Sequence, residues 1–241
     1  KGETSAIEAT GTHTITAKVT SVSPSGSTMS VSYSGSPAIN DNWISRQTVT
    51  ADLRHYTRLA ANGVLAVRLK GQKSWGQQPD FMYFGGNSEL RGYDYLEFIG
   101  HKAFFANAEL RFPMIDAMLT PFGVLGGLRG VLFAGVGGAG FNGQSFQVYT
   151  SKNETIKPII GYRQNALGLL DPVYGAQTTV SGFRLKDARA SYGIGLETAL
   201  LGLPMHFDWS WRTLFNEGYE DLTFAAQALQ EDRKSTRLNS S

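Results

Sequence analysis

The sequence contains no cysteine, so it can form neither a disulfide framework nor a thiolate metal site. It also has no apolar run of about 18 residues, which argues against a membrane-spanning helix but leaves open spanning strands, whose signal is much weaker. Charged residues make up only 17% of the chain, below the ~25% usual for soluble domains. The formal net charge of +2 offers no cationic surface, and we expect no nucleic-acid partner.

The sequence is rich in alternation of apolar and polar residues with a period of two, the pattern of a β-strand with two different faces. In the segment 101–112, Phe104 and Leu110 lie on one face, while Glu109 and Arg111 lie on the other. The same pattern predicts about nine strands, at 8–21, 26–36, 45–59, 63–76, 100–112, 128–141, 188–200, 204–212 and 220–229.

The lengths of strands and connections favour a membrane barrel. Soluble strands average about 5–6 residues, whereas outer-membrane strands need about 9–11, and several strands predicted here are that long. Short turns alternate with longer connections at 35–43, 77–99 and 142–187, as in transmembrane barrels. The connection 114–127 is long where a short turn is expected. We predict no helix longer than a turn and no domain boundary.

The polar faces of the predicted strands carry charges of both signs, which suit a wet, hydrogen-bonded interior better than a dry core. We therefore predict an all-β fold, a partial antiparallel transmembrane β-barrel with apolar side chains toward lipid. A soluble antiparallel barrel or sandwich with a polar exterior is the alternative from the pattern alone. The predicted lumen residues are Asp52, Arg54, Arg58, Arg68, Lys70, Glu109, Arg111, Arg129, Arg189, Glu197, Asp208 and Arg212.

The stretch GGNSELRGYD, residues 85–94, places an arginine and a tyrosine on a glycine-rich tip, and a tip in water needs neither. It resembles the Arg-Gly-Tyr/Phe loop motif of the Omp85 superfamily, also called the bacterial surface antigen D15 family. The segments 105–113 and 129–141 resemble the next two strands of that family, and 191–211 resembles a later hairpin. Their order and spacing match over most of residues 45–212.

That resemblance implies that the loop folds back into the barrel lumen, where its arginine contacts acidic side chains on the inner wall. The loop motif comprises Gly85, Gly86, Arg91, Gly92 and Tyr93. The glycines permit tight, partly left-handed turns. Arg91 offers a planar fork of donors for carboxylates, and Tyr93 can pack and hydrogen-bond against the wall.

Glu109 matches the family's acidic position on the strand after the loop, and we predict an Arg91–Glu109 pair. The family also carries an aspartate on the following strand, where this chain has Gly135. Asp208 and Glu197 are the candidate secondary lumen acids that could replace it.

Other motifs do not point to an enzyme. The stretch GVGGAG, residues 135–140, fits the dinucleotide fingerprint, but no helical pattern follows it. The four histidines lack the spacing of metal ligands. His206 and Asp208 share a face, but no serine on a sharp strand-to-helix turn accompanies them. We expect no enzymatic activity, no metal and no cofactor.

The two ends of the chain look unnatural. Residues 231–241, EDRKSTRLNSS, read as the translation of a sequencing adapter, and Lys1 is neither an initiator methionine nor the start of a signal peptide. We expect 231–241 to be a non-native tail. Residues 1–230 are then expected to be the C-terminal part of a barrel that, in the family, has about sixteen strands.

The resemblance implies a place in the bacterial outer membrane and a role in outer-membrane protein assembly, insertion or polypeptide translocation. Its partners would be outer-membrane lipid, client polypeptides or barrel precursors, and missing N-terminal soluble domains. The Arg91 loop would plug the lumen, and a weak seam would admit client strands by β-augmentation. The alternative is a passive pore, or a barrel that anchors a missing upstream propeller or hydrolase.

Overall fold

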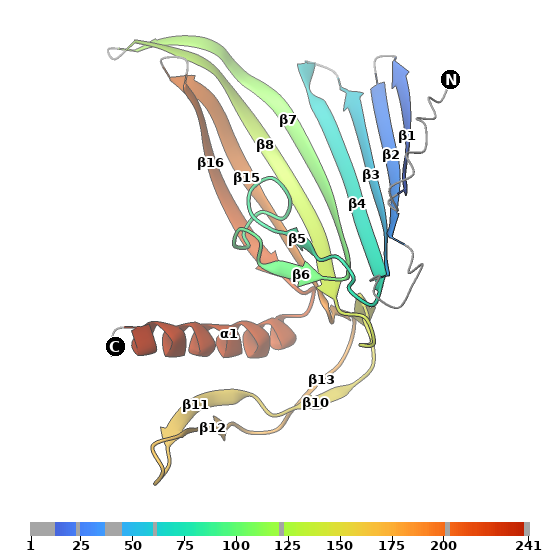
Figure 1. Cartoon of the computed structure of the whole chain (residues 1–241). Helices are drawn as coiled ribbons and strands as arrows, with labels where there is room; N and C mark the ends of the chain where they lie inside the picture. The colour runs from blue at the N-terminus through green and yellow to red at the C-terminus, as the bar shows by residue number, and fades with distance from the viewer. Residues whose placement is uncertain are drawn as a thin grey trace. The chain divides into compact units, whose positions relative to one another are not determined.

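The computed structural model in Figure 1 describes residues 13–22, 25–36, 45–59, 62–120, 123–200 and 203–238. The chain forms two compact units, the first of Lys1–Phe146 with Asp187–Arg212 and the second of Gln147–Lys186 with Thr213–Ser241. The sequence pattern did not predict this division. No helix in the described residues is both long and apolar enough to cross a membrane.

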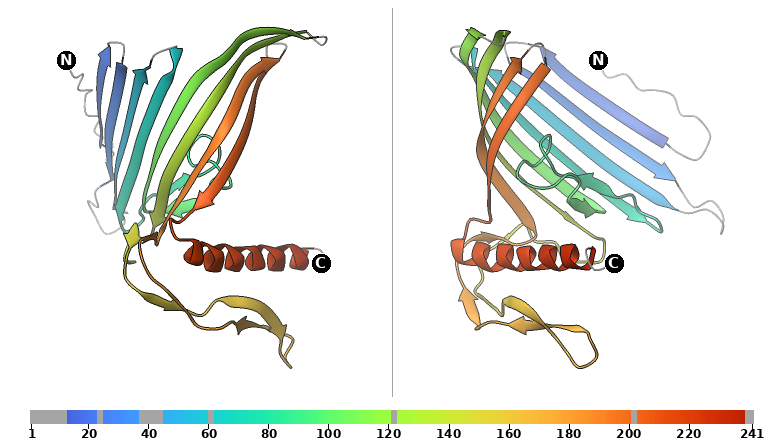
Figure 2. Two further views of the ribbon diagram at one scale, coloured as in Figure 1. Left: turned by 180° about the vertical axis from the view of Figure 1, so that it is seen from behind. Right: turned by 90° about the vertical axis from the view of Figure 1, so that its left-hand side faces the viewer.

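The first unit is built on one curved antiparallel sheet (Figure 2). In the described part of the chain, its eight strands follow one another in chain order: β1 (His13–Val22), β2 (Ser25–Ser36), β3 (Arg46–Arg58), β4 (Val64–Gly76), β7 (Lys102–Thr120), β8 (Gly123–Gly140), β15 (Ala188–Leu200) and β16 (Leu203–Thr213). The all-β prediction is confirmed. The first five residues of the predicted strand 8–21 lie outside the described residues.

The two faces of the sheet differ as the alternation predicts. One, called here the outer face, exposes large apolar side chains such as Leu69, Leu132 and Trp209. The opposite, inner face carries charged pairs such as Asp52 with Arg68, whose closest oxygen and nitrogen are 2.9 Å apart. Apolar side chains that stay exposed on a sheet of long strands are typical of a barrel that faces lipid.

The predicted strand 220–229 is wrong, because these residues lie in the helix α1 (Glu217–Leu238) of the second unit. The described sheet therefore has eight strands rather than nine. Oδ1 of Asn216 accepts a hydrogen bond from the backbone N–H of Tyr219 at 3.1 Å and caps the helix. Glu220 adds negative charge to the first turn, where the helix dipole favours it.

The long connection predicted at 114–127 is also wrong. Strands β7 and β8 stay paired as far as Thr120 and Gly123, so the described residues of this segment belong to two paired strands. The apolar residues there extend the strands and do not form a loop.

Short ribbons occupy the two long connections. In the first unit, β5 (Met82–Phe84) pairs with β6 (Phe98–Gly100). The second unit joins α1 to three more ribbons: β9 (Tyr149–Thr150) with β14 (Arg184–Leu185), β10 (Glu154–Ile156) with β13 (Thr178–Val180), and β11 (Ile159–Gln164) with β12 (Leu170–Tyr174).

Candidate functional site

The 85–97 loop joins β5 to β6 and lies against the inner face of the sheet (Figure 1). Three of its glycines, Gly85, Gly86 and Gly92, have positive φ angles, and at two of them a side chain would also clash. Gly85 has φ of 137°, and a Cβ there would collide with the carbonyl oxygen of Asp94. Gly92 has φ of 84°, and a Cβ there would lie 2.8 Å from Oγ of Ser210. Side chains other than hydrogen are strained in this region, so glycine sets the path of the loop.

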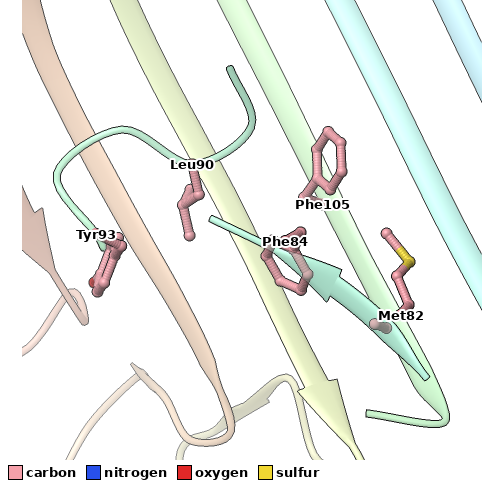
Figure 3. Packing of buried hydrophobic residues seen from close by; sticks show 6 residues of the cluster. Met82, Phe84, Leu90, Tyr93 and Phe105 are labelled. Carbon is pink, nitrogen blue, oxygen red and sulfur yellow. The ribbon is translucent and has the colours of Figure 1, made fainter. Parts of the chain in front are cut away.

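An apolar cluster holds the loop on the wall (Figure 3). Phe84 on β5, Leu90 in the loop and Phe105 on β7 are fully buried, and Tyr93 is 5% exposed. The rings of Phe84 and Phe105 lie 5.5 Å apart between centroids. Burying a large apolar side chain contributes about 1.5–3 kcal/mol, so this cluster strongly favours the docked loop.

Arg91 lies beside the cluster and bridges two strands. Its Nη2 donates to Oε1 of Glu109 on β7 at 2.9 Å, and its Nη1 donates to Oδ1 of Asp208 on β16 at 3.3 Å. The guanidinium also lies 4.5 Å from the ring centroid of Phe133 on β8. A single planar cation thus contacts three different strands of the inner face, which is the geometry that the arginine fork suits.

The residues after Arg91 extend these contacts to the last two strands. The hydroxyl of Tyr93 donates to the carbonyl oxygen of Ala190 on β15 at 3.1 Å. The guanidinium of Arg212 on β16 lies 4.7 Å from the centroid of the Tyr93 ring, and its Nε donates to the carbonyl oxygen of Gly92. The loop therefore contacts four consecutive strands, β7, β8, β15 and β16.

The loop itself fills the space above Gly135, the position at which the expected aspartate is absent. Gly135 lies on the inner face, and a Cβ there would be 2.9 Å from Cδ1 of Leu90 and 2.8 Å from Oδ1 of Asn107. Leu90 thus takes the space that a side chain on β8 would need. The second acid at Arg91 is supplied by Asp208 instead.

The structure thus brings together Arg91, Glu109 and Asp208, but it does not bring Glu197 to the arginine. Oε1 of Glu197 lies 3.5 Å from Nδ1 of His206. Sequence reasoning placed Arg212 on the inner face without connecting it to the loop. It missed Leu90 entirely, although the glycine at position 135 was a signal that the loop needed space there.

The inner face beyond the loop is open, and charged and apolar side chains both line it. A cavity of about 1030 Å³ is lined there by charged side chains that include Arg54, Arg68, Arg111 and Glu197. Within the described residues, no group of three or more histidine or acidic side chains is arranged to hold a metal ion.

Comparison with known proteins gives one family. A family model described as the Omp85 superfamily domain matches residues 16–228. Comparisons with curated proteins and with solved structures found no significant match.

Proposed function

Because the chain belongs to the Omp85 superfamily, a family of bacterial outer-membrane β-barrels that assemble or translocate proteins without enzymatic chemistry, we propose that its barrel inserts or translocates client polypeptides while the 85–97 loop braces its inner wall. The partners of the family are outer-membrane lipid and client polypeptides. The finer assignment, to this loop and these strands, is our inference.

The observation that carries the proposal is the double contact of Arg91 with Glu109 on β7 and Asp208 on β16. In the described part of the sheet, β16 is an outermost strand. An outermost strand has backbone N–H and C=O groups free to pair with another strand. A loop that holds β16 to β7 would keep this edge in place while a client strand adds to it by β-augmentation.

The test uses the full-length protein in lipid vesicles, with an unfolded outer-membrane barrel protein as client. The rate at which the client becomes folded is followed by its heat-dependent shift in gel mobility. Arg91→Ala is compared with Arg58→Ala, which removes an exposed inner-face arginine for which no contact with the loop is found in the described residues. We expect Arg91→Ala to slow client folding several-fold and Arg58→Ala to leave it unchanged.

Two outcomes would overturn different parts of the proposal. Equal client folding by both variants would show that the loop does not support the activity. A wild-type protein that neither speeds client folding nor moves polypeptide into vesicles would favour the alternative, a pore or an anchor for an upstream soluble domain.

A further inference from the structure

The second unit carries three exposed aromatic rings in one strip, formed by Tyr149, Phe183 and Phe215. Their exposed fractions are 61%, 49% and 57%. The ring centroids of Tyr149 and Phe183 lie 5.6 Å apart, and those of Phe183 and Phe215 lie 6.1 Å apart. The three residues come from distant parts of the sequence, so folding has gathered them on the surface without burying them. Contiguous apolar patches on a protein surface are typical of sites that contact another protein or a membrane.

The fold holds Phe183 outward by burying its neighbour. The side chain of Arg184 is 1% exposed, and its Nη2 donates to Oε2 of Glu154 at 2.9 Å. The guanidinium also lies 5.1 Å from the ring centroid of Tyr219 in α1. Arg184 and Leu185 are both buried, so the chain is fixed in the interior directly after the exposed Phe183.

Phe215 is held outward at a conformational cost. Leu214 before it is fully buried, and Phe215 itself has φ of 61°, in the left-handed region. A bulky side chain rarely adopts this conformation, whereas glycine adopts it freely. The backbone N–H of Phe215 donates to Oγ1 of Thr213 at 3.0 Å, which helps to hold the turn. The exposed ring is therefore a built feature of the turn.

The chain connection indicates what covers the strip. Phe215 follows Thr213, the last residue of β16, by two positions. At no more than ~3.6 Å per residue, it lies within about 7 Å of the end of a membrane-crossing strand. The headgroup layer on each side of the hydrocarbon core is roughly 5–8 Å thick. Aromatic residues are enriched in this layer, where the hydroxyl of Tyr149 can remain in water.

We propose that Tyr149, Phe183 and Phe215 form an interfacial anchor that inserts into the headgroup layer of the outer membrane and ties the second unit to the lipid surface. The proposal depends on the membrane location of the family and not on the Arg91 contacts.

The absence of cysteine allows a clean test, since a single introduced cysteine can be labelled selectively. Phe215→Cys in this cysteine-free chain is labelled with an environment-sensitive fluorophore in phosphatidylcholine vesicles, with and without lipid that carries a nitroxide quencher near the headgroup. Leu167→Cys is the matched control, because Leu167 is apolar, 84% exposed and in the same unit. We expect the label at position 215 to emit at shorter wavelength and to be quenched several-fold more than the label at 167.

Equal quenching at both positions would overturn the proposal. So would a label at position 215 that emits at short wavelength without quenching, because protein rather than lipid would then cover it. A second labelled variant, Tyr149→Cys, guards against a local effect of the change at Phe215. Adding Phe183→Ser to the Tyr149→Cys variant should reduce the quenching of the label at position 149 several-fold. Unchanged quenching there would show that the three rings do not insert together.

Discussion

Replacing Arg91 with methionine should destabilise the barrel by about 3–5 kcal/mol, because breaking a buried ion pair leaves an uncompensated charge. The side chains of Arg91, Glu109 and Asp208 are only 10%, 18% and 16% exposed, so water can replace little of the lost contact. Methionine keeps much of the apolar volume, and the loss therefore reports the charge and its hydrogen bonds.

The loss of the Arg91 guanidinium should affect the carboxylates of Glu109 and Asp208 differently. Glu109 keeps Arg111, whose Nη2 lies 2.6 Å from its Oε2. In the described residues, no other ion pair is found for Asp208. Adding Asp208→Asn to the methionine variant should therefore recover about 1–2 kcal/mol, whereas adding Glu109→Gln should recover less. Arg91→Lys should fall between wild type and methionine, because lysine offers a point charge instead of a two-armed fork.

Urea unfolding in lipid vesicles, followed by tryptophan fluorescence, measures these differences in the free energy of unfolding. Heat-dependent gel mobility checks that each variant is folded at the start. The reasoning fails if Arg91→Met costs less than about 1 kcal/mol, the size of an exposed surface pair. It also fails if the losses from Arg91→Met and Asp208→Asn simply add in the double variant, since residues in contact should couple.

Three further predictions concern the wall, the loop and the second unit. Gly135→Ala should cost about 1–3 kcal/mol in the same unfolding assay, because its Cβ would lie 2.9 Å from Cδ1 of Leu90, and Leu90→Ala should relieve part of that loss. Tyr93→Phe should cost about 1–2 kcal/mol, because it leaves a buried carbonyl oxygen without its donor; no loss would contradict the hydrogen bond. Partial burial opposes ionisation of Glu220, but hydrogen bonds from the Leu214 amide and the Thr213 hydroxyl outweigh it and lower the pKa of Glu220 below its ordinary value of 4.5. Ionised Glu220 therefore stabilises the start of α1 fully above its ordinary pKa, and this stabilisation is lost as the pH falls through the lowered pKa. The helix signal in circular dichroism should decrease over that pH range in the wild-type protein and not in Glu220→Gln.

The short segment after β16 shows where pattern reading fails. Leu222 and Phe224 alternate with the polar residues Asp221 and Thr223, which fits a strand, but alternation over so few positions cannot exclude a helix. The decisive signal was the cap, in which Asn216 precedes an acidic first turn. At 114–127 the reverse occurred, because apolar residues that look like a connection continue two paired strands.

The sequence alone determined which residues share a face and which face is apolar, because the side chains of a strand alternate with a period of two whatever its partners are. It also determined where the 85–97 loop can bend, since Gly85 and Gly92 have positive φ angles that suit glycine. Only the tertiary structure decided that Asp208, 117 residues from Arg91, completes its ion pairs and that Leu90 fills the space above Gly135. Strand order and the depth of the loop set those neighbours, and neither is written in the local pattern of any one segment.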